Sequence, residues 1–112
     1  MIDDLKEVTE LIDKIKAVLP ISAYPTKKLC SSLKNNNGIK VKPKNLLEIA
    51  DVINMGNEGG ICCEISHKEA KELLIVSLTH LRIKKIHPLA KEIKAYQIKR
   101  TRELASISYS QT

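Results

Sequence analysis

Cysteine and histidine are the residues of this chain most able to do chemistry, because thiolates and imidazoles are the common protein ligands of zinc. The six are Cys30, Cys62, Cys63, His67, His80 and His87. Neither Cys-x-x-Cys nor His-x-x-x-His occurs among them, and adjacent residues of a strand point to opposite faces. A metal site would have to combine Cys62 or Cys63 with His67 and His80 across a hairpin. We instead predict that Cys62 and Cys63 are reduced, small hydrophobic side chains that hold no metal.

Hydroxyl, glycine and carboxylate groups are also present, but none has the spacing of a catalytic motif. Ser77 and Thr79 lie beside His80 in sequence, yet an alternating strand places His80 opposite both hydroxyls. No Gly-x-Ser-x-Gly elbow, catalytic-cysteine signature, Gly-x-Gly-x-x-Gly pattern or P-loop occurs. Glu48 and Asp51 are predicted on an exposed helix face, which neither raises a carboxyl pKa nor encloses a substrate. We therefore expect that the protein is not an enzyme and has no cofactor.

Length and composition indicate one ordinary globular domain over residues 1–112, with 43% hydrophobic and 29% charged residues. No apolar run approaches the roughly 18 residues that span a bilayer, and the acidic start is unlike a signal peptide. An odd number of cysteines suits a reducing compartment, so we expect a cytoplasmic protein with no membrane association. Tyr24, Tyr96 and Tyr109 are the only aromatic residues, and three scattered rings predict no platform for stacking single-stranded nucleic acid.

The net charge of +6 is distributed in blocks along the chain. Residues 14–47 contain eight lysines and no acid, whereas residues 1–13 and 48–72 are each net acidic. The remaining C-terminal part, from residue 73, is again basic. Such blocks create local fields that attract polyanions, although a lysine-rich solvated surface would give the same pattern.

Periodicity predicts helices at about 3–19, 26–36, 43–55 and 88–105, and a very short strand at 39–42. Apolar runs at 60–65 and 73–81 predict a hairpin whose loop is His67–Glu72. The run 73–81 also fits a helix with a capping box at residues 66–69, but the strand at 60–65 needs a pairing partner. The predicted core is Leu5, Ile12, Ile15, Leu46, Ile49, Ile53, Ile93 and Leu104.

Helix, turn, helix and hairpin over Thr26–Leu81 is an order that resembles winged helix-turn-helix domains in general, without a motif of one family. The fold expected is α+β, with a winged-helix-like core at about 26–81 flanked by long terminal helices at 2–19 and 88–105. The resemblance implies a small basic DNA-binding protein, such as a transcriptional regulator, in which helix 43–55 enters the major groove of double-stranded DNA. It also implies that the hairpin tip His67–Glu72 contacts the DNA backbone or the minor groove.

The residues implied by this resemblance fall into two groups. Lys44, Asn45 and Asn54 would contact base edges. The phosphate contacts would be Lys27, Lys28, Lys34, Lys40 and Lys42.

The alternative is a non-catalytic protein-interaction module or adaptor on the same scaffold. Glu48 and Asp51 would then offer an acidic face to a basic protein partner. The terminal helices could pair between two copies as a homodimer, or their apolar stripes could pack on the core of their own chain.

Overall fold

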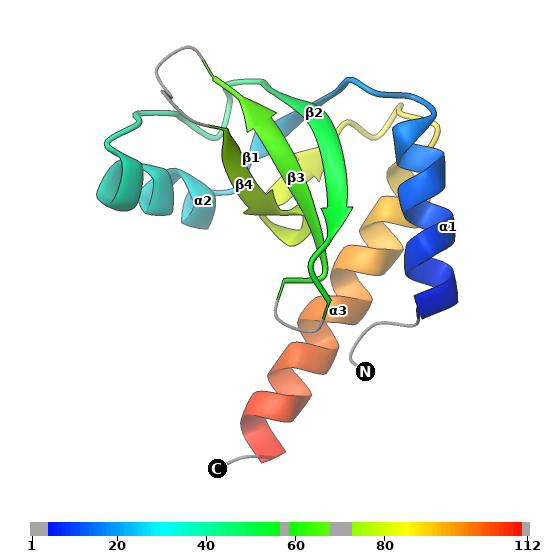
Figure 1. Ribbon diagram of the computed structural model, residues 1–112. Helices are drawn as coiled ribbons and strands as arrows, with labels where there is room; N and C mark the ends of the chain where they lie inside the picture. Colours follow the sequence, from blue (N-terminus) through cyan, green and yellow to red (C-terminus); the bar gives the residue numbers. More distant parts are fainter. Residues whose placement is uncertain (1–4, 57–58, 68–72, 111–112) are drawn as a thin grey trace.

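The computed structural model describes residues 5–56, 59–67 and 73–110, except for the side chains of 106–110 (Figure 1). The elements are α1 (Leu5–Lys16), β1 (Ile21–Pro25), α2 (Lys27–Ser32) with the π-helical turn η1 (Leu33–Asn37), β2 (Leu47–Asn54), β3 (Ile61–Ser66), β4 (Leu74–Ser77), the 3₁₀ turn η2 (Leu78–His80), β5 (Leu81–Ile83) and α3 (Ala90–Ser110). Helices and strands are therefore mixed, and the predicted α+β class is confirmed. None of the helices in the described part of the chain is long and apolar enough to cross a membrane.

The strands form one antiparallel sheet in the order β4-β3-β2-β1-β5. Strands β1 to β4 follow one another as neighbours, and β5 returns to pair with the free edge of β1. The turn η2 makes this return, because the chain leaves β4 at one edge and enters β5 at the other. The sheet thus brings two distant parts of the chain, residues 23–25 and 81–83, side by side.

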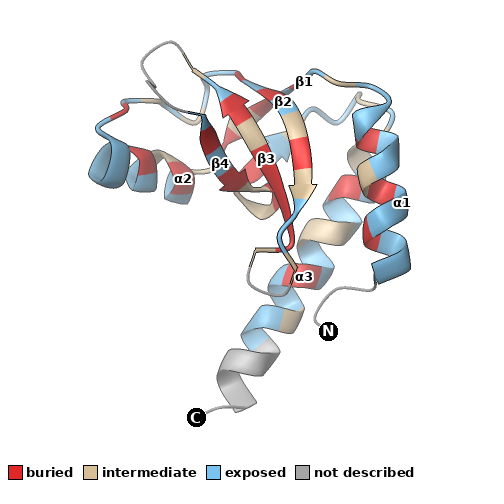
Figure 2. Ribbon diagram, viewed as in Figure 1, coloured by how far each residue is buried: buried red, intermediate tan, exposed pale blue. Residues whose placement is uncertain are grey.

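A single aliphatic core lies between the sheet and the helices (Figure 2). Its members come from every strand and from all three helices, and in Figure 2 they concentrate on β3 and on the inner sides of α1 and α2. Without Phe or Trp, interdigitated Ile, Leu and Val side chains fill the interior. Of the predicted core, Ile15, Ile49 and Ile93 are buried, while Ile12 and Ile53 are half-buried. The prediction is wrong for Leu5, Leu46 and Leu104, which are exposed.

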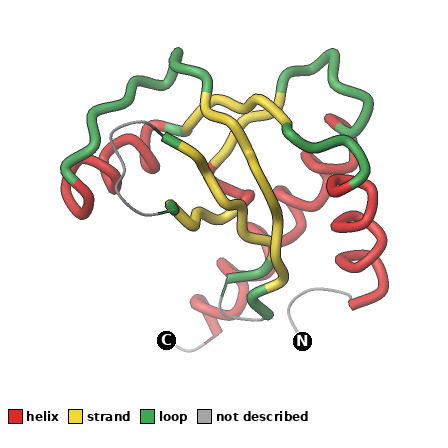
Figure 3. Tube along the Cα trace, turned by 45° about the horizontal axis from the view of Figure 1, so that its top comes forward, coloured by secondary structure: helices red, strands yellow, loops and turns green. Residues whose placement is uncertain are grey.

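The sheet twists strongly, and the helices pack at its two ends (Figures 1 and 3). On one side, α1 packs on β2 through Val8, Leu11 and Ile15. Its neighbour α3 contacts η2 and β5. On the other side, α2 follows β1 directly and buries Leu29.

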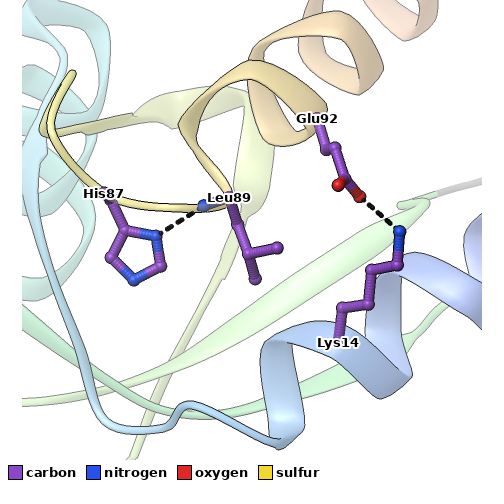
Figure 4. Close-up of polar contacts among 4 residues, drawn as sticks. All are labelled: Lys14, His87, Leu89 and Glu92. Atoms are coloured by element: carbon purple, nitrogen blue, oxygen red, sulfur yellow. Dashed lines mark hydrogen bonds and ion pairs between the residues drawn. The ribbon is translucent and has the colours of Figure 1, made fainter.

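Two polar interactions lie at the start of α3 (Figure 4). His87 Nδ1 accepts a hydrogen bond of 3.0 Å from the backbone N–H of Leu89. Lys14 of α1 pairs with Glu92 in the first turn of α3 at 2.9 Å. Near the two ends of the chain, where helices were predicted at about 3–19 and 88–105, the structure has α1 at Leu5–Lys16 and α3 at Ala90–Ser110.

The helix predicted over Pro43–Met55 is wrong, because residues 47–54 form β2. A bulge at Ala50 shifts the pairing between Ile49 and Asp51. The inward residues of β2 therefore fall at Leu47, Ile49 and Val52 rather than at every second position. The predicted helical stripe instead combined Ile49 with Leu46, which is exposed, and Ile53, which is half-buried, so apolar residues that do not face the core imitated helical periodicity. Between α2 and β3 the described residues, 33–56 and 59–60, contain no second α-helix, so the predicted helix-turn-helix order does not form.

Two further strand predictions need correction. The short strand predicted at 39–42 is wrong, since residues 38–46 form a loop that is anchored by the buried side chain of Ile39. The hairpin predicted from 60–65 and 73–81 is confirmed for β3 and β4, whose register includes Cys63↔Val76. The second run does not continue as one strand, because η2 interrupts it before β5. Residues 68–72 of the predicted loop lie outside the described residues.

Candidate nucleic-acid interface

Two segments without any acidic residue, 14–47 and 73–91, meet in the fold. Pairing of β1 with β5 joins them, with Tyr24 opposite Arg82 and Pro25 opposite Leu81. The backbone N–H of Thr26 also donates to the carbonyl of His80 at 3.0 Å. The exposed cations of α2, η1, the loop 38–46 and β5 are called the basic surface below. They are Lys27, Lys28, Lys34, Lys40, Lys42, Lys44 and Arg82.

The lysines of α2 point outward because the opposite side of this helix is anchored. Thr26 caps the helix, its Oγ1 accepting from the N–H of Leu29 at 3.2 Å. Leu29 and, in η1, Leu33 are buried in the core. Lys27 and Lys28 therefore stand in the first turn on the solvent side, which the structure shows as exposed.

The loop 38–46 presents its lysines on a fixed turn. Asn45 Oδ1 accepts from the N–H of Lys42, and the N–H of Asn45 donates to the carbonyl of Lys42, both at 2.9 Å. Arg82 of β5 reaches this turn, and its Nη2 donates to the carbonyl of Pro43 at 2.6 Å. Lys42 and Lys44, which flank Pro43, are consequently held next to Arg82.

Arg82 is held from a second direction by Tyr24. Its guanidinium carbon lies 5.6 Å from the centroid of the Tyr24 ring, within the range of a cation–π contact. Both residues are on the sheet face that points away from the core, since their strand neighbours Ala23 and Leu81 are buried. The side chain of Arg82 is exposed and that of Tyr24 is half-buried.

Two titratable groups report the positive field around this surface. Burial lowers the pKa of His80 from its ordinary value, and the nearby charge of Lys28 lowers it further. Burial raises the pKa of the Cys30 thiol, whereas a backbone hydrogen bond and the charge of Arg82 act in the opposite direction. Both charge effects favour the less positive form of the group, as expected beside clustered cations.

The predicted site residues divide according to where the structure places them. All six predicted lysines belong to the basic surface. The amides predicted to contact bases instead stabilise turns: Asn45 closes the turn at Lys42, and Asn54 Oδ1 accepts from the N–H of Gly56 at 2.9 Å. Asn54 lies at the far end of β2, about 23 Å from Leu47 at 3.3 Å per residue. Arg82, Tyr24 and His80 were not predicted, because only the β1–β5 pairing adds them to this surface.

The cysteines show no arrangement for chemistry. Cys30, Cys62 and Cys63 are free thiols. Burial raises the pKa of Cys63 to about 12, so its thiol stays protonated near neutral pH. The part of the chain that the structure describes contains no group of three or more metal-binding side chains.

A groove of about 390 Å³ lies between α1 and α3. An ion pair between Lys14 and Glu92 crosses it at one end, and a second between Glu7 and Lys99, at 3.1 Å, crosses it at the other. Both pairs are about half-exposed, so they contribute little to stability. The groove carries both charges in similar number, unlike the basic surface.

Comparison with known proteins adds no function, since no protein-family model, curated protein or solved structure matches this chain.

Proposed function

We propose that this chain is a small, non-catalytic protein that binds nucleic acid through its basic surface. The observation that supports this most directly is the meeting of two acid-free segments, which places seven exposed cations on contacting elements. Lysine and arginine contacts to phosphates supply most of the affinity of non-specific nucleic-acid binding. Three free thiols suit a reducing compartment such as the cytoplasm.

Binding to double-stranded DNA remains part of the proposal, including a role in transcription regulation. A winged-helix mode would need a recognition helix at 43–55, where the chain instead has a loop, a turn and β2. The support for DNA binding is thus the set of exposed cations on α2, the loop 38–46 and β5, which would contact phosphates. Base-edge contact by Lys44 remains open to test, while Asn45 and Asn54 would have to give up their turn hydrogen bonds to take part.

Acidic side chains mark where such an interface would end. Glu48 pairs in register with Ser22 of β1, two residues from Tyr24 on the same outer face. Asp51 and Glu64 lie opposite each other on β2 and β3 further along that face. Phosphates would be repelled there, so the interface would cover the β1–β5 side of the sheet and leave the β2–β3 side uncovered.

The test is binding of a random DNA duplex over a range of salt concentrations. Each phosphate contact contributes a slope of about −0.9 in the logarithm of affinity against the logarithm of salt concentration. Lys40→Ala combined with Lys42→Ala should therefore flatten the slope by up to about 2 and weaken all sequences alike. Lys94→Ala with Arg102→Ala removes the same charge from exposed positions of α3 and is the matched control.

Two results would count against the proposal. One is the absence of binding to the duplex at low salt and micromolar protein, which would exclude the double-stranded DNA part of the proposal. The other is an equal effect of both double variants, because that would mean that net charge matters and that the basic surface does not.

A protein-interaction role is the second candidate, and the distal half of α3 favours it. Figure 1 shows this half extending beyond the body of the molecule. The exposed apolar residues of α3 are Ile98, near the middle of the helix, and Leu104, in this distal half. A homodimer through this helix predicts that the sedimentation coefficient rises with concentration and that Ile98→Asp abolishes the rise. A monomer at all concentrations would exclude the homodimer.

A further inference from the structure

We propose that Tyr24 and Arg82 form a stacking site for one unpaired nucleobase, so that the protein binds single-stranded nucleic acid in preference to duplex. This inference rests on the proposed nucleic-acid binding and names the class of nucleic acid. It also departs from the sequence-based expectation, in which scattered tyrosines offered no platform. The platform needs only one ring, because an arginine guanidinium is a second plane on which bases stack.

Contacts within the protein hold both planar groups, the Tyr24 ring and the Arg82 guanidinium. Tyr24 of β1 and Arg82 of β5 are direct cross-strand partners. The guanidinium lies against the ring, 5.6 Å from its centroid, and the 2.6 Å hydrogen bond to the carbonyl of Pro43 holds the outer nitrogen. Little side-chain freedom is then lost when a base arrives, which lowers the entropic cost of binding.

Arg82 is also available to a ligand. No carboxylate within residues 5–56, 59–67 and 73–105 forms an ion pair with it. A guanidinium has five N–H donors, and the hydrogen bond to Pro43 uses one of them. An exposed arginine held by a ring and a carbonyl keeps its charge for a phosphate and its plane for a base.

Lysines that could contact phosphates are close to this site on two sides. Lys42 and Lys44 flank the residue that Arg82 binds, and Lys28 approaches from α2 near His80. A strand whose base stacks on Arg82 would have its neighbouring phosphates beside these lysines. The arrangement matches the general form of single-strand binding, which combines a basic track with planar side chains.

A duplex cannot use this site in the same way. Its bases are paired and stacked inside the helix, so none presents a face to Tyr24 or Arg82. The helix predicted at 43–55 to enter a groove is absent, because residues 47–54 form strand β2. Duplex DNA could contact the lysines through its phosphates alone.

The experiment compares three probes of equal length: a mixed-sequence single strand, an abasic strand that keeps only sugar and phosphate, and a duplex. Wild type should bind the intact strand more tightly than the other two. Arg82→Lys keeps the charge but removes the plane, and it should weaken binding of the intact strand about 5- to 150-fold, the loss that corresponds to one base stack. Binding of the abasic strand should change less than about twofold.

Tyr24→Phe is the matched control at the second position, because it keeps the ring and should keep the preference. Tyr24→Leu should lose that preference, and Arg82→Lys provides the same test if Tyr24→Leu does not fold. Equal affinity of wild type for intact and abasic strands would overturn the stacking site but leave phosphate binding in place. If a mononucleotide competes fully with the intact strand, the claim that the site binds a single strand would be overturned. Absence of binding to all three probes would overturn the proposed function as well.

Discussion

Gly60 closes the β2–β3 hairpin against α3, and its environment has no space for a side chain. Its φ is +64°, and an added Cβ would come within 2.7 Å of the Arg100 guanidinium and still closer to the Tyr96 hydroxyl. The N–H of Ile61 donates to that hydroxyl at 2.8 Å. Any shift that relieves the clash therefore also disturbs the link between the hairpin and α3.

Gly60→Ala should lower the free energy of unfolding by about 1–3 kcal/mol for the unfavourable φ, and by a similar amount for overpacking. Gly38→Ala is the matched control, because Gly38 has φ +66° and nothing within 4 Å of the Cβ position. Urea unfolding of both variants separates the two contributions. Equal losses would show that Tyr96 and Arg100 leave room for a methyl group.

Cys63 should make stability depend on pH in the alkaline range. Its ordinary pKa is 9.0, and burial raises the pKa in the folded state to about 12. Below pH 9 both states hold the proton and stability is unaffected. Between pH 9 and about 12 the unfolded thiol ionises while the folded thiol does not. Stability therefore falls as the pH rises, at a slope of up to about 1.4 kcal/mol per pH unit.

The measurement is the free energy of unfolding of wild type and of Cys63→Ala across this range. Tyrosines and lysines titrate in the same window, so the informative quantity is the difference between the two proteins. As the pH rises, the free energy of unfolding of wild type should fall relative to that of Cys63→Ala. A constant difference would mean that Cys63 ionises as readily in the folded as in the unfolded state.

At the scale of elements, η2 determines where β5 lies, and Gln97 of α3 holds η2. The Nε2 of Gln97 donates to the carbonyls of Leu78 at 2.7 Å and Leu81 at 2.6 Å. One amide thus satisfies a carbonyl at each end of the turn between β4 and β5. The position of Arg82, next along β5, depends on this contact.

Gln97→Met keeps the side-chain volume but leaves both carbonyls without this donor. We expect a loss of about 1–3 kcal/mol in the free energy of unfolding, since the contacts are only partly buried. Ile98→Met, at an exposed neighbour on the same helix, should change stability by less than about 0.5 kcal/mol. Thermal unfolding of the two variants at the same midpoint would contradict a structural role for Gln97.

The elements differ in how far the sequence could predict them. Thr26, the prolines and the amphipathic stripes determined the helices at 5–16, 27–37 and 90–110 through local interactions. Strand β2 could not be found in this way, because Leu46 and Ile53, which do not face the core, fall with Ile49 at helical spacing. Residues 47–54 form a strand because they pair with β1 and β3. The periodicity of 47–54 itself does not encode these partners.

For the whole molecule, the sequence predicted the distribution of charge along the chain but not the arrangement of the charged residues in space. The acid-free segment 14–47 was visible in the sequence, and its exposed lysines form most of the basic surface. The addition of Arg82 required the return of β5 to β1, a connection between the two edges of the sheet. Of the predicted base contacts, Asn54 lies away from this surface for a related reason, since its role depended on a helix at 43–55. A candidate site assembled by long-range strand pairing is thus only partly accessible to local sequence patterns.

The two halves of α3 contribute differently to the molecule. The first half supplies the buried Ile93, the hydroxyl of Tyr96 to the hairpin, the amide of Gln97 to η2 and the buried Arg100. Beyond Arg100, residues 101–105 are exposed or at most half-buried (Figure 2). The fold should therefore require the helix as far as Arg100 and tolerate its loss beyond Ala105.

A chain that ends at Ala105 should unfold within about 4–8 °C of the full chain, which corresponds to a change of no more than about 1 kcal/mol for a domain near this size. A chain that ends at Leu89 should not fold, because it loses the cover of η2 and of the β2–β3 hairpin together. Circular dichroism melts at two protein concentrations measure both. If the melting temperature of the chain that ends at Ala105 falls further than this, but only at the higher protein concentration, the distal half of α3 holds two copies together. A larger loss at both concentrations would mean that it stabilises the body of its own chain.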